Sequence, residues 1–159
     1  MRYEFGKVIN EIINKDKKNY ILICDIGYKV FDPVWANNPD HILNTGIQEA
    51  ATIGMASGMA MEGLKPWVYS ITPFIMERPF EQIKLDILQQ NQNVKLVSYG
   101  DYDILGPSHI TDIDAICSAL KIKLFKPKNS KETRKITLKM SKTIGPETMF
   151  LKKDRSKEK

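Results

Sequence analysis

The sequence predicts an α/β domain with a mainly parallel sheet flanked by helices. Segments with apolar residues at helical spacing alternate with short apolar runs along the chain. Its 159 residues are the length of one ordinary domain, and its 42% hydrophobic and 27% charged content excludes a disordered chain or a coiled coil. No repeat or linker interrupts this order. We therefore expect one domain over residues 1–153, followed by a basic disordered tail at 154–159.

The first half of the chain alternates between helical and strand-like patterns. It is predicted to contain a helix at 3–15, a strand at 20–24, a loop at 32–40, a strand at 41–45 and a helix at 48–61. The first helix follows from apolar residues that recur at helical spacing from Phe5 to Ile13, whereas the strands are short apolar runs. Asn and Pro residues predict the loop. Gly63 is expected to end the second helix, because glycine readily adopts the left-handed conformation after a last turn.

The second half continues the alternation. It is predicted to contain a strand at 65–70, a long helix at 73–92, a strand at 94–98, a loop at 99–108, a helix at 111–120, a strand at 122–125, a helix from about 129 to 141 and a strand at 148–152. Pro79 is expected to kink or break the long helix, since proline removes a backbone donor. Asn129 and Glu132 have nearly the spacing of a capping box at the start of the last helix.

Charge and composition narrow the classes of function. The net charge of +5 is concentrated in the C-terminal third, where the tail mixes signs and has no aromatic residues for base stacking, so we expect no nucleic acid partner. The longest uncharged stretch, residues 50–61, is too short to span a bilayer, and the N-terminus has no apolar signal core. A cytoplasmic protein is expected. Cys24 and Cys117 form no Cys-x-x-Cys pair and are expected to be inert core residues.

The helix at 48–61 is small and apolar on every side, which predicts burial all round. It is interpreted either as a subunit interface or as a central core helix, and periodicity does not separate the two. Glu49 is the one charge at its start, where a strand of a parallel sheet ends and ligand sites are commonly placed. The alternative is a first-turn acid that the helix dipole stabilises.

The run from Asn44 to Pro66 resembles the Gly-Ile-x-Glu segment, small-residue helix and Gly-x-Lys-Pro turn of the transketolase family. That family includes deoxyxylulose-phosphate synthase and the pyruvate dehydrogenase β subunit. The resemblance continues through residues 70–74 and 78–83, the loop at 106–109 and Gly145-Pro146, and so covers about residues 1–153. It implies the three-layer fold of a pyrimidine-binding domain in a thiamin diphosphate-dependent enzyme.

The resemblance also assigns roles around the pyrimidine ring. Glu49 matches the glutamate that faces the ring nitrogen N1′. Sharing a proton with that nitrogen favours the imino form of the ring, whose exocyclic nitrogen can then remove the thiazolium C2 proton. Phe74 matches the position whose ring packs on the aminopyrimidine, although a core phenylalanine would explain it too. Ile71 and Arg78 are implied to be neighbours of this pocket.

Two further residues are candidates by position. Asp25 follows the first strand, where the family approaches the cofactor, but an Asp-x-Gly turn explains it equally well. His109 matches the histidine of the family's Gly-Pro-Thr-His loop, which assists proton transfer or holds the substrate. His41 precedes a strand and is expected to be structural or solvent-facing.

The sequence departs from the family pattern in two places. Leu105 stands where sugar-handling members carry an acid that binds a hydroxyl of the donor substrate, and residues 99–105 contain no histidine, which transketolases proper carry in this segment. Either the donor is therefore not an ordinary ketose phosphate, or another chain supplies the polar contacts to it. The family binds the diphosphate through Mg²⁺ with a Gly-Asp-Gly motif, because this cation prefers oxygen ligands. The sequence has only Gly100-Asp101-Tyr102, so no metal ligands are expected in this chain.

The leading interpretation is the pyrimidine-domain subunit of a split, transketolase-like enzyme. With a separate Gly-Asp-Gly subunit, in a hetero-oligomer of two of each, it would transfer a two-carbon ketol or acyl unit through a thiamin-bound carbanion. The substrate would be a small sugar phosphate or a 2-oxo acid. A split 2-oxo acid decarboxylase or carboligase is the alternative enzyme. A non-catalytic basic α/β module is the alternative outside enzymes.

Overall fold

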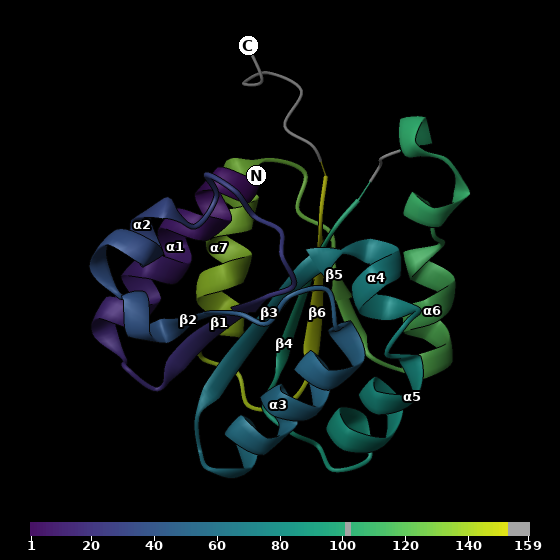
Figure 1. The fold of residues 1–159 in the computed structure, drawn as a ribbon, viewed down its shortest axis with the longest axis horizontal. Coiled ribbons are helices and arrows are strands. Elements are labelled where there is room, and N and C mark those ends of the chain that lie inside the picture. The colour runs from purple at the N-terminus through teal and green to yellow at the C-terminus, as the bar shows by residue number, and fades with distance from the viewer. Residues whose placement is uncertain (101–102, 153–159) are drawn as a thin grey trace.

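The computed structural model describes residues 1–100 and 103–152, which form a parallel sheet between two layers of helices (Figure 1). The six strands follow the order β2-β1-β3-β4-β6-β5, and every strand pair among the described residues is parallel. The strands are β1 (Asn19–Ile23), β2 (Ile42–Asn44), β3 (Lys65–Ile71), β4 (Lys95–Tyr99), β5 (Lys123–Phe125) and β6 (Glu147–Leu151). The predicted α/β fold is confirmed. Asp101, Tyr102 and the predicted tail at 154–159 lie outside the described residues.

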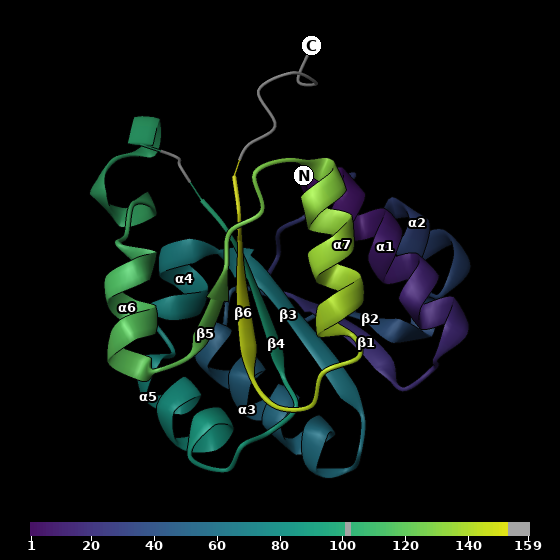
Figure 2. The ribbon, with the colours of Figure 1, turned by 180° about the vertical axis from the view of Figure 1, so that it is seen from behind.

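Helices cover both faces of the sheet, as Figures 1 and 2 show from opposite sides. One layer contains α1 (Arg2–Lys15), α2 (Asp32–Asn37) and α7 (Ser130–Met140). The other contains α3 (Glu49–Met61), α4 (Thr72–Met76), α5 (Phe80–Gln82), a π-helical turn (Ile83–Leu88) and α6 (Ile113–Leu120).

Alternation along the strands builds the two cores. In β1, Ile21 and Ile23 belong to the core under α1 and α7, whereas Leu22 belongs to the core under α3 and α6. Successive side chains of a strand point to opposite faces, so one strand feeds both layers. This explains why short apolar runs without polar alternation predicted buried parallel strands.

The structure divides two of the predicted segments into smaller elements. The loop predicted at 32–40 instead contains α2 and a short 3-10 turn (Pro39–His41). Pro33 lies in the first turn of α2, where proline is favoured because its missing N–H has no helical partner there. The long helix predicted at 73–92 is broken as expected, because α4 ends before Pro79 and α5 begins after it.

The helix at 48–61, which is predicted to be buried all round, is buried on one face only within this chain. Its inner face packs on the sheet, but its outer face is exposed. The exposed residues are Ala50, Ala51, Gly54, Met55, Gly58 and Met61. The central-helix interpretation therefore fails, because the sheet covers one side of α3 only and no other described element covers the second. Separately, no helix in residues 1–100 and 103–152 is long and apolar enough to cross a membrane.

A buried ion pair lies at the amino end of the strands, far from their carboxyl edge. Lys95 and Glu147 are register partners in β4 and β6, with Nζ and Oε2 3.4 Å apart. Lys95 also donates to the carbonyl of Gly145 at 2.5 Å. Burial lowers the pKa of Lys95. Burial opposes ionisation of Glu147, but hydrogen bonds from Thr143 and Lys123 and the charge of Lys95 hold its pKa below the usual value.

We expect Glu147→Gln to lower the free energy of unfolding by about 3–5 kcal/mol, because it leaves the buried Lys95 charge unpaired. Urea unfolding at pH 7 measures this. Since the pKa of Glu147 is depressed in the folded state, its contribution is present above the unfolded pKa of about 4.3 and is lost as the pH falls through the folded pKa. The difference between wild type and variant should therefore shrink below about pH 4.

A surface pair gives the matched control. Glu11 accepts from Arg134 across α1 and α7, and its side chain is 39% exposed. Glu11→Gln should change the free energy of unfolding by at most about 1 kcal/mol. Equal effects of Glu147→Gln and Glu11→Gln would contradict the assignment of a stabilising buried pair.

Candidate active site

The candidate site lies at the carboxyl edge of the sheet, where β1, β2 and β3 end side by side (Figure 1). Glu49 begins α3 a few residues after β2 ends. Ile71 is the last residue of β3, and Phe74 lies in α4 directly after it. The parallel arrangement brings these segments to the same edge, where open α/β sheets place their ligands.

Four of the predicted site residues form one continuous cluster. Nη1 of Arg78 donates to both carboxylate oxygens of Glu49, at 3.2 and 3.1 Å. The Arg78 guanidinium carbon lies 3.8 Å from the centroid of the Phe74 ring. The His109 ring stands edge to face with Phe74, with 5.0 Å between the centroids. Acid, cation, aromatic ring and imidazole are thus in contact in that order.

The cluster combines a buried acid with an accessible cation. The Glu49 side chain is 4% exposed, whereas that of Arg78 is 46% exposed. Glu49 lies in the first turn of α3, where the helix dipole stabilises a negative charge. Arg78 occupies the joint between α4 and α5, outside either helix. The carboxylate is therefore enclosed, and the guanidinium is the part of the ion pair that reaches solvent.

A hydroxyl network fixes the start of α3 to the strand ends. Thr45 Oγ1 lies 2.7 Å from Thr52 Oγ1 and donates to the carbonyl of Ile23 at 3.1 Å. Cys24 contacts Thr52 from the end of β1, with sulfur and oxygen 3.6 Å apart. These contacts join β1, the segment after β2 and the first turn of α3, which begins at Glu49.

Both cysteines are buried and unpaired, as predicted from the sequence. Burial raises the pKa of the Cys24 thiol, and burial also raises the pKa of Cys117 to about 11. A thiol with a raised pKa is protonated at neutral pH and is a poor nucleophile. Neither residue is a candidate for catalysis.

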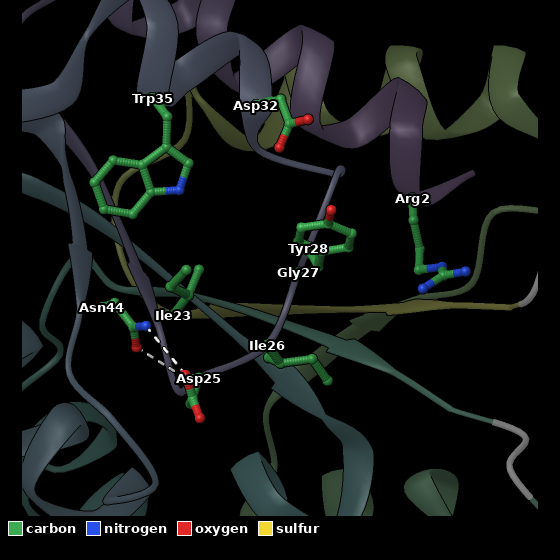
Figure 3. A pocket seen from close by; sticks show the side chains of 9 residues that line it. All are labelled: Arg2, Ile23, Asp25, Ile26, Gly27, Tyr28, Asp32, Trp35 and Asn44. Carbon is green, nitrogen blue, oxygen red and sulfur yellow. Dashed lines mark hydrogen bonds between the residues drawn. The ribbon is translucent and has the colours of Figure 1, made fainter.

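Asp25 lies in a different pocket from the Glu49 cluster. This pocket has a volume of about 590 Å³ and is shown in Figure 3. It is lined by Arg2, Ile23, Asp25, Ile26, Gly27, Tyr28, Asp32, Trp35 and Asn44. Asp25 has a left-handed backbone, with φ of 53°, and its N–H donates to Asn44 Oδ1 at 3.0 Å. Gly27 also has a positive φ, of 96°, so the Asp-x-Gly turn is present as well as the pocket.

Several residues of this second pocket were not predicted from the sequence. Asn44 ends β2 beside Asp25, and its amide donates back to Asp25 Oδ1 at 3.3 Å. The rule that polar residues at strand ends share one edge predicts such a pair. Trp35 and Asp32 lie on α2, in the segment predicted as a loop, and no local pattern indicates where they point.

Three other residues discussed from the sequence, Ile71, Leu105 and His41, are not part of the contacts that link Glu49, Arg78, Phe74 and His109. Ile71 is buried, with 8% of its surface exposed, and is followed by Thr72, whose buried hydroxyl has no hydrogen-bond partner among the described residues. Leu105 is 55% exposed, in the 3-10 turn Asp103–Leu105. His41 lies at the amino end of β2, with Nδ1 3.2 Å from the carbonyl of Asn19, which agrees with the structural role expected for it.

The described part of the chain contains no cluster of side chains of the kind that binds a metal ion. Within residues 1–100 and 103–152, no three of the His, Cys, Asp and Glu side chains lie close enough together to hold a metal ion.

Comparisons with known proteins agree with the fold. A family model described as "Transketolase, pyrimidine binding domain" matches residues 1–157. One apulose-4-phosphate transketolase subunit, from Actinobacillus succinogenes, is 34% identical over 113 residues, which are 68% of this chain and 36% of that protein. An uncharacterised 33.6 kDa protein of the fasciation locus in Rhodococcoides fascians is 35% identical over 120 residues, which are 70% of this chain and 38% of that protein.

A solved structure described as "Split gene transketolase, inactive beta4 tetramer" superposes with a TM-score of 0.84 at 27% identity. The match covers 95% of this chain and 50% of that one. The chain thus spans little more than a third of the length of these two curated relatives, and about half of the length of this structural neighbour.

Proposed function

Because the chain belongs to the transketolase family of pyrimidine-binding domains, we propose that it provides the pyrimidine side of a thiamin diphosphate site. The enzyme would transfer a two-carbon ketol or acyl unit. The observation that carries this proposal is the buried carboxylate of Glu49, held against a flat cation that stacks on Phe74. The names of the relatives, which include a transketolase subunit and a split-gene transketolase, support the same assignment.

The residues present fit an aminopyrimidine. The Arg78 guanidinium is planar, delocalised and rich in N–H donors, and the site binds it by its edge to Glu49 and by its face to Phe74. A pyrimidine protonated at N1′ offers the same combination of a donating edge and an aromatic face. A site that holds one such group has the polarity and shape to hold the other.

Glu49 would hold and return the proton at N1′. When bound, thiamin diphosphate supplies an acidic carbon at C2 and an electron sink for the fragment that is transferred. The low exposure of Glu49 keeps water from competing for its carboxylate. Phe74 would orient the ring so that N1′ meets the carboxylate edge on.

His109 would act on the substrate side of the site. It contacts the outer part of the cluster through the ring of Phe74. Ser108 Oγ lies 3.0 Å from His109 Nδ1, which orients the imidazole. The segment is tied to α4 because Thr111 donates to Glu77. A substrate that reached the cofactor past this loop would meet His109 first.

His109→Ala should lower kcat by about 10²-fold, the size of a lost acid or base, while the Kd for thiamin diphosphate stays within about twofold. Steady-state kinetics and calorimetry on the assembled enzyme measure the two quantities. His41→Ala is the matched control, since His41 lies at the opposite edge of the sheet, and it should leave both unchanged. Collapse of cofactor binding in His109→Ala would place this loop at the cofactor instead.

Leu105 favours a second candidate reaction. An exposed leucine stands where a sugar-handling enzyme of the family would carry an acid, so a 2-oxo acid decarboxylase or carboligase is the alternative. The chemistry of the donor separates the two. Turnover of 2-oxo acids without turnover of ketose phosphates would favour the alternative, and the reverse would favour the transferase.

The diphosphate and its Mg²⁺ are proposed to bind to a separate subunit with a Gly-Asp-Gly motif. No such motif occurs in the sequence, and Mg²⁺ at a diphosphate prefers carboxylate and carbonyl ligands. The exposed apolar face of α3 is the proposed contact surface for that subunit. Two copies of each subunit would give the simplest closed assembly, and we propose that it works in the cytoplasm.

A further inference from the structure

Arg78 makes two contacts at once, and both are contacts that the cofactor would need. Its Nη1 engages Oε1 and Oε2 of Glu49, and its guanidinium plane lies over Phe74. Because one guanidinium spans both partners, the face of Phe74 that it covers is the face nearest the carboxylate. A ring that shares a proton with Glu49 while packing on Phe74 has to use this same space.

The two side chains of the ion pair differ in how easily each could exist without the other. Removing the cation would leave the Glu49 carboxylate buried without a charge partner, which is strongly unfavourable. Arg78, by contrast, is nearly half exposed and can regain its hydration by turning outward. The guanidinium therefore turns away in only a small fraction of molecules until another group takes over its contact with Glu49.

The backbone around Arg78 suits such a movement. The residue follows α4 and precedes Pro79, and it belongs to no helix. Its own N–H reaches the carbonyl of Pro73 at a long 3.4 Å. A side chain at this joint can turn without breaking a helical hydrogen bond.

We propose that Arg78 holds the place of the aminopyrimidine and is displaced when the ring binds. This inference rests on the proposed function of Glu49 and Phe74. It adds that Arg78 competes with the cofactor, so that the observed affinity is the intrinsic affinity reduced by the fraction of molecules in which Arg78 has turned away. Arg78 also keeps the buried acid paired until the cofactor arrives.

Cofactor titration of the assembled enzyme tests this inference. The chain is co-purified with its Gly-Asp-Gly subunit, and thiamin diphosphate with Mg²⁺ is titrated by calorimetry. Removing the competitor in Arg78→Ala should lower the Kd about tenfold, or about 1.4 kcal/mol. Arg134→Ala is the matched control, because Arg134 is also an exposed, acid-paired arginine, 41% exposed, but joins α7 to α1. Its Kd should stay within about twofold of wild type.

A second variant and a second readout guard against a folding defect. Arg78→Gln keeps a neutral hydrogen-bond donor beside Glu49 and should also bind the cofactor more tightly. In wild type labelled with ¹⁵N-arginine, the Arg78 side-chain N–H signal should be protected from exchange with water and should lose this protection on addition of the cofactor. This readout does not depend on turnover.

The outcomes separate this inference from the proposed function. Unchanged or weaker binding in both Arg78 variants, with wild type binding normally, overturns the displacement and leaves the roles of Glu49 and Phe74 standing. Weaker binding would make Arg78 a cofactor ligand. Failure of wild type and of all variants to bind the cofactor in a stable complex would overturn the proposed function itself.

Discussion

Replacing Glu49 with glutamine should slow deuterium exchange at C2 of bound thiamin diphosphate by at least about 10²-fold, and by up to about 10⁴-fold. Glutamine keeps the size of the side chain and a hydrogen bond to N1′, but it cannot share a proton with that nitrogen. Exchange is measured by NMR after acid quench, in the complex with the Gly-Asp-Gly subunit. The effect belongs to the activation step, so it should appear without any acceptor substrate.

Glu62→Gln is the matched control for this experiment. Glu62 caps the opposite end of α3 and is exposed, so the variant removes one acid from the same helix without touching the cluster. Its exchange rate should equal that of wild type. If exchange in a fully assembled, cofactor-loaded Glu49→Gln enzyme were as fast as in wild type, Glu49 would have no part in activation.

The largest expected effect is the difference between the chain alone and the chain assembled with a second subunit. The purified chain alone should show no tight binding of thiamin diphosphate and no turnover, whereas co-expression with a Gly-Asp-Gly subunit should give a stable complex that has both. The reason is that the diphosphate and Mg²⁺ contribute most of the charge by which the cofactor is held. Calorimetry and size-exclusion chromatography of the two preparations measure this difference. Tight, metal-dependent binding and turnover by the chain alone would remove the need for a partner.

The contact surface on α3 can be tested in the same complex. A side chain added at Gly58 meets open space in the chain by itself, and glycine is a poor helix former, so Gly58→Glu should fold at least as well as wild type. It should nevertheless prevent assembly, because it places a charge in an apolar interface. Ala119→Glu, at an exposed alanine of α6, is the control and should assemble normally. Normal assembly of Gly58→Glu would place the interface elsewhere.

The order of the elements is predictable because the inner strands β1, β3, β4 and β6 are buried on both faces, and because helices such as α1 have a regular apolar spacing. The helix α2 was missed because its Pro and Asn residues favour turns locally, whereas the burial of Val34 and the contacts of Asn38 with Asn10 and Asn14 of α1 fix it in the folded chain. For α3, composition alone did not distinguish a central helix from an interface helix. Small apolar residues on all sides predict burial on all sides, but what covers each face is decided by packing, and within this chain the sheet covers only one.

The candidate site was predictable to the extent that motifs mark it. The resemblance indicated Glu49, Phe74, Arg78 and His109, and the structure brings all four into contact. The ion pair between Glu49 and Arg78 was not foreseen, because no local rule relates two residues 29 positions apart. The pocket around Asp25 was not foreseen either, since it depends on how α1 and α2 pack beside the end of β1.

If the outer face of α3 is the proposed contact surface, it would also link the lifetime of the chain to its assembly. Met55 and Met61 are exposed there, 41% and 59% respectively, and exposed thioethers are oxidised to polar sulfoxides. A sulfoxide on this face would make it less apolar and less able to pack against another subunit. A partner that covers α3 would shield both methionines. Chains made in excess of their partner would then lose competence to assemble as they age, so balanced synthesis of the two subunits would preserve the pool that can still form enzyme.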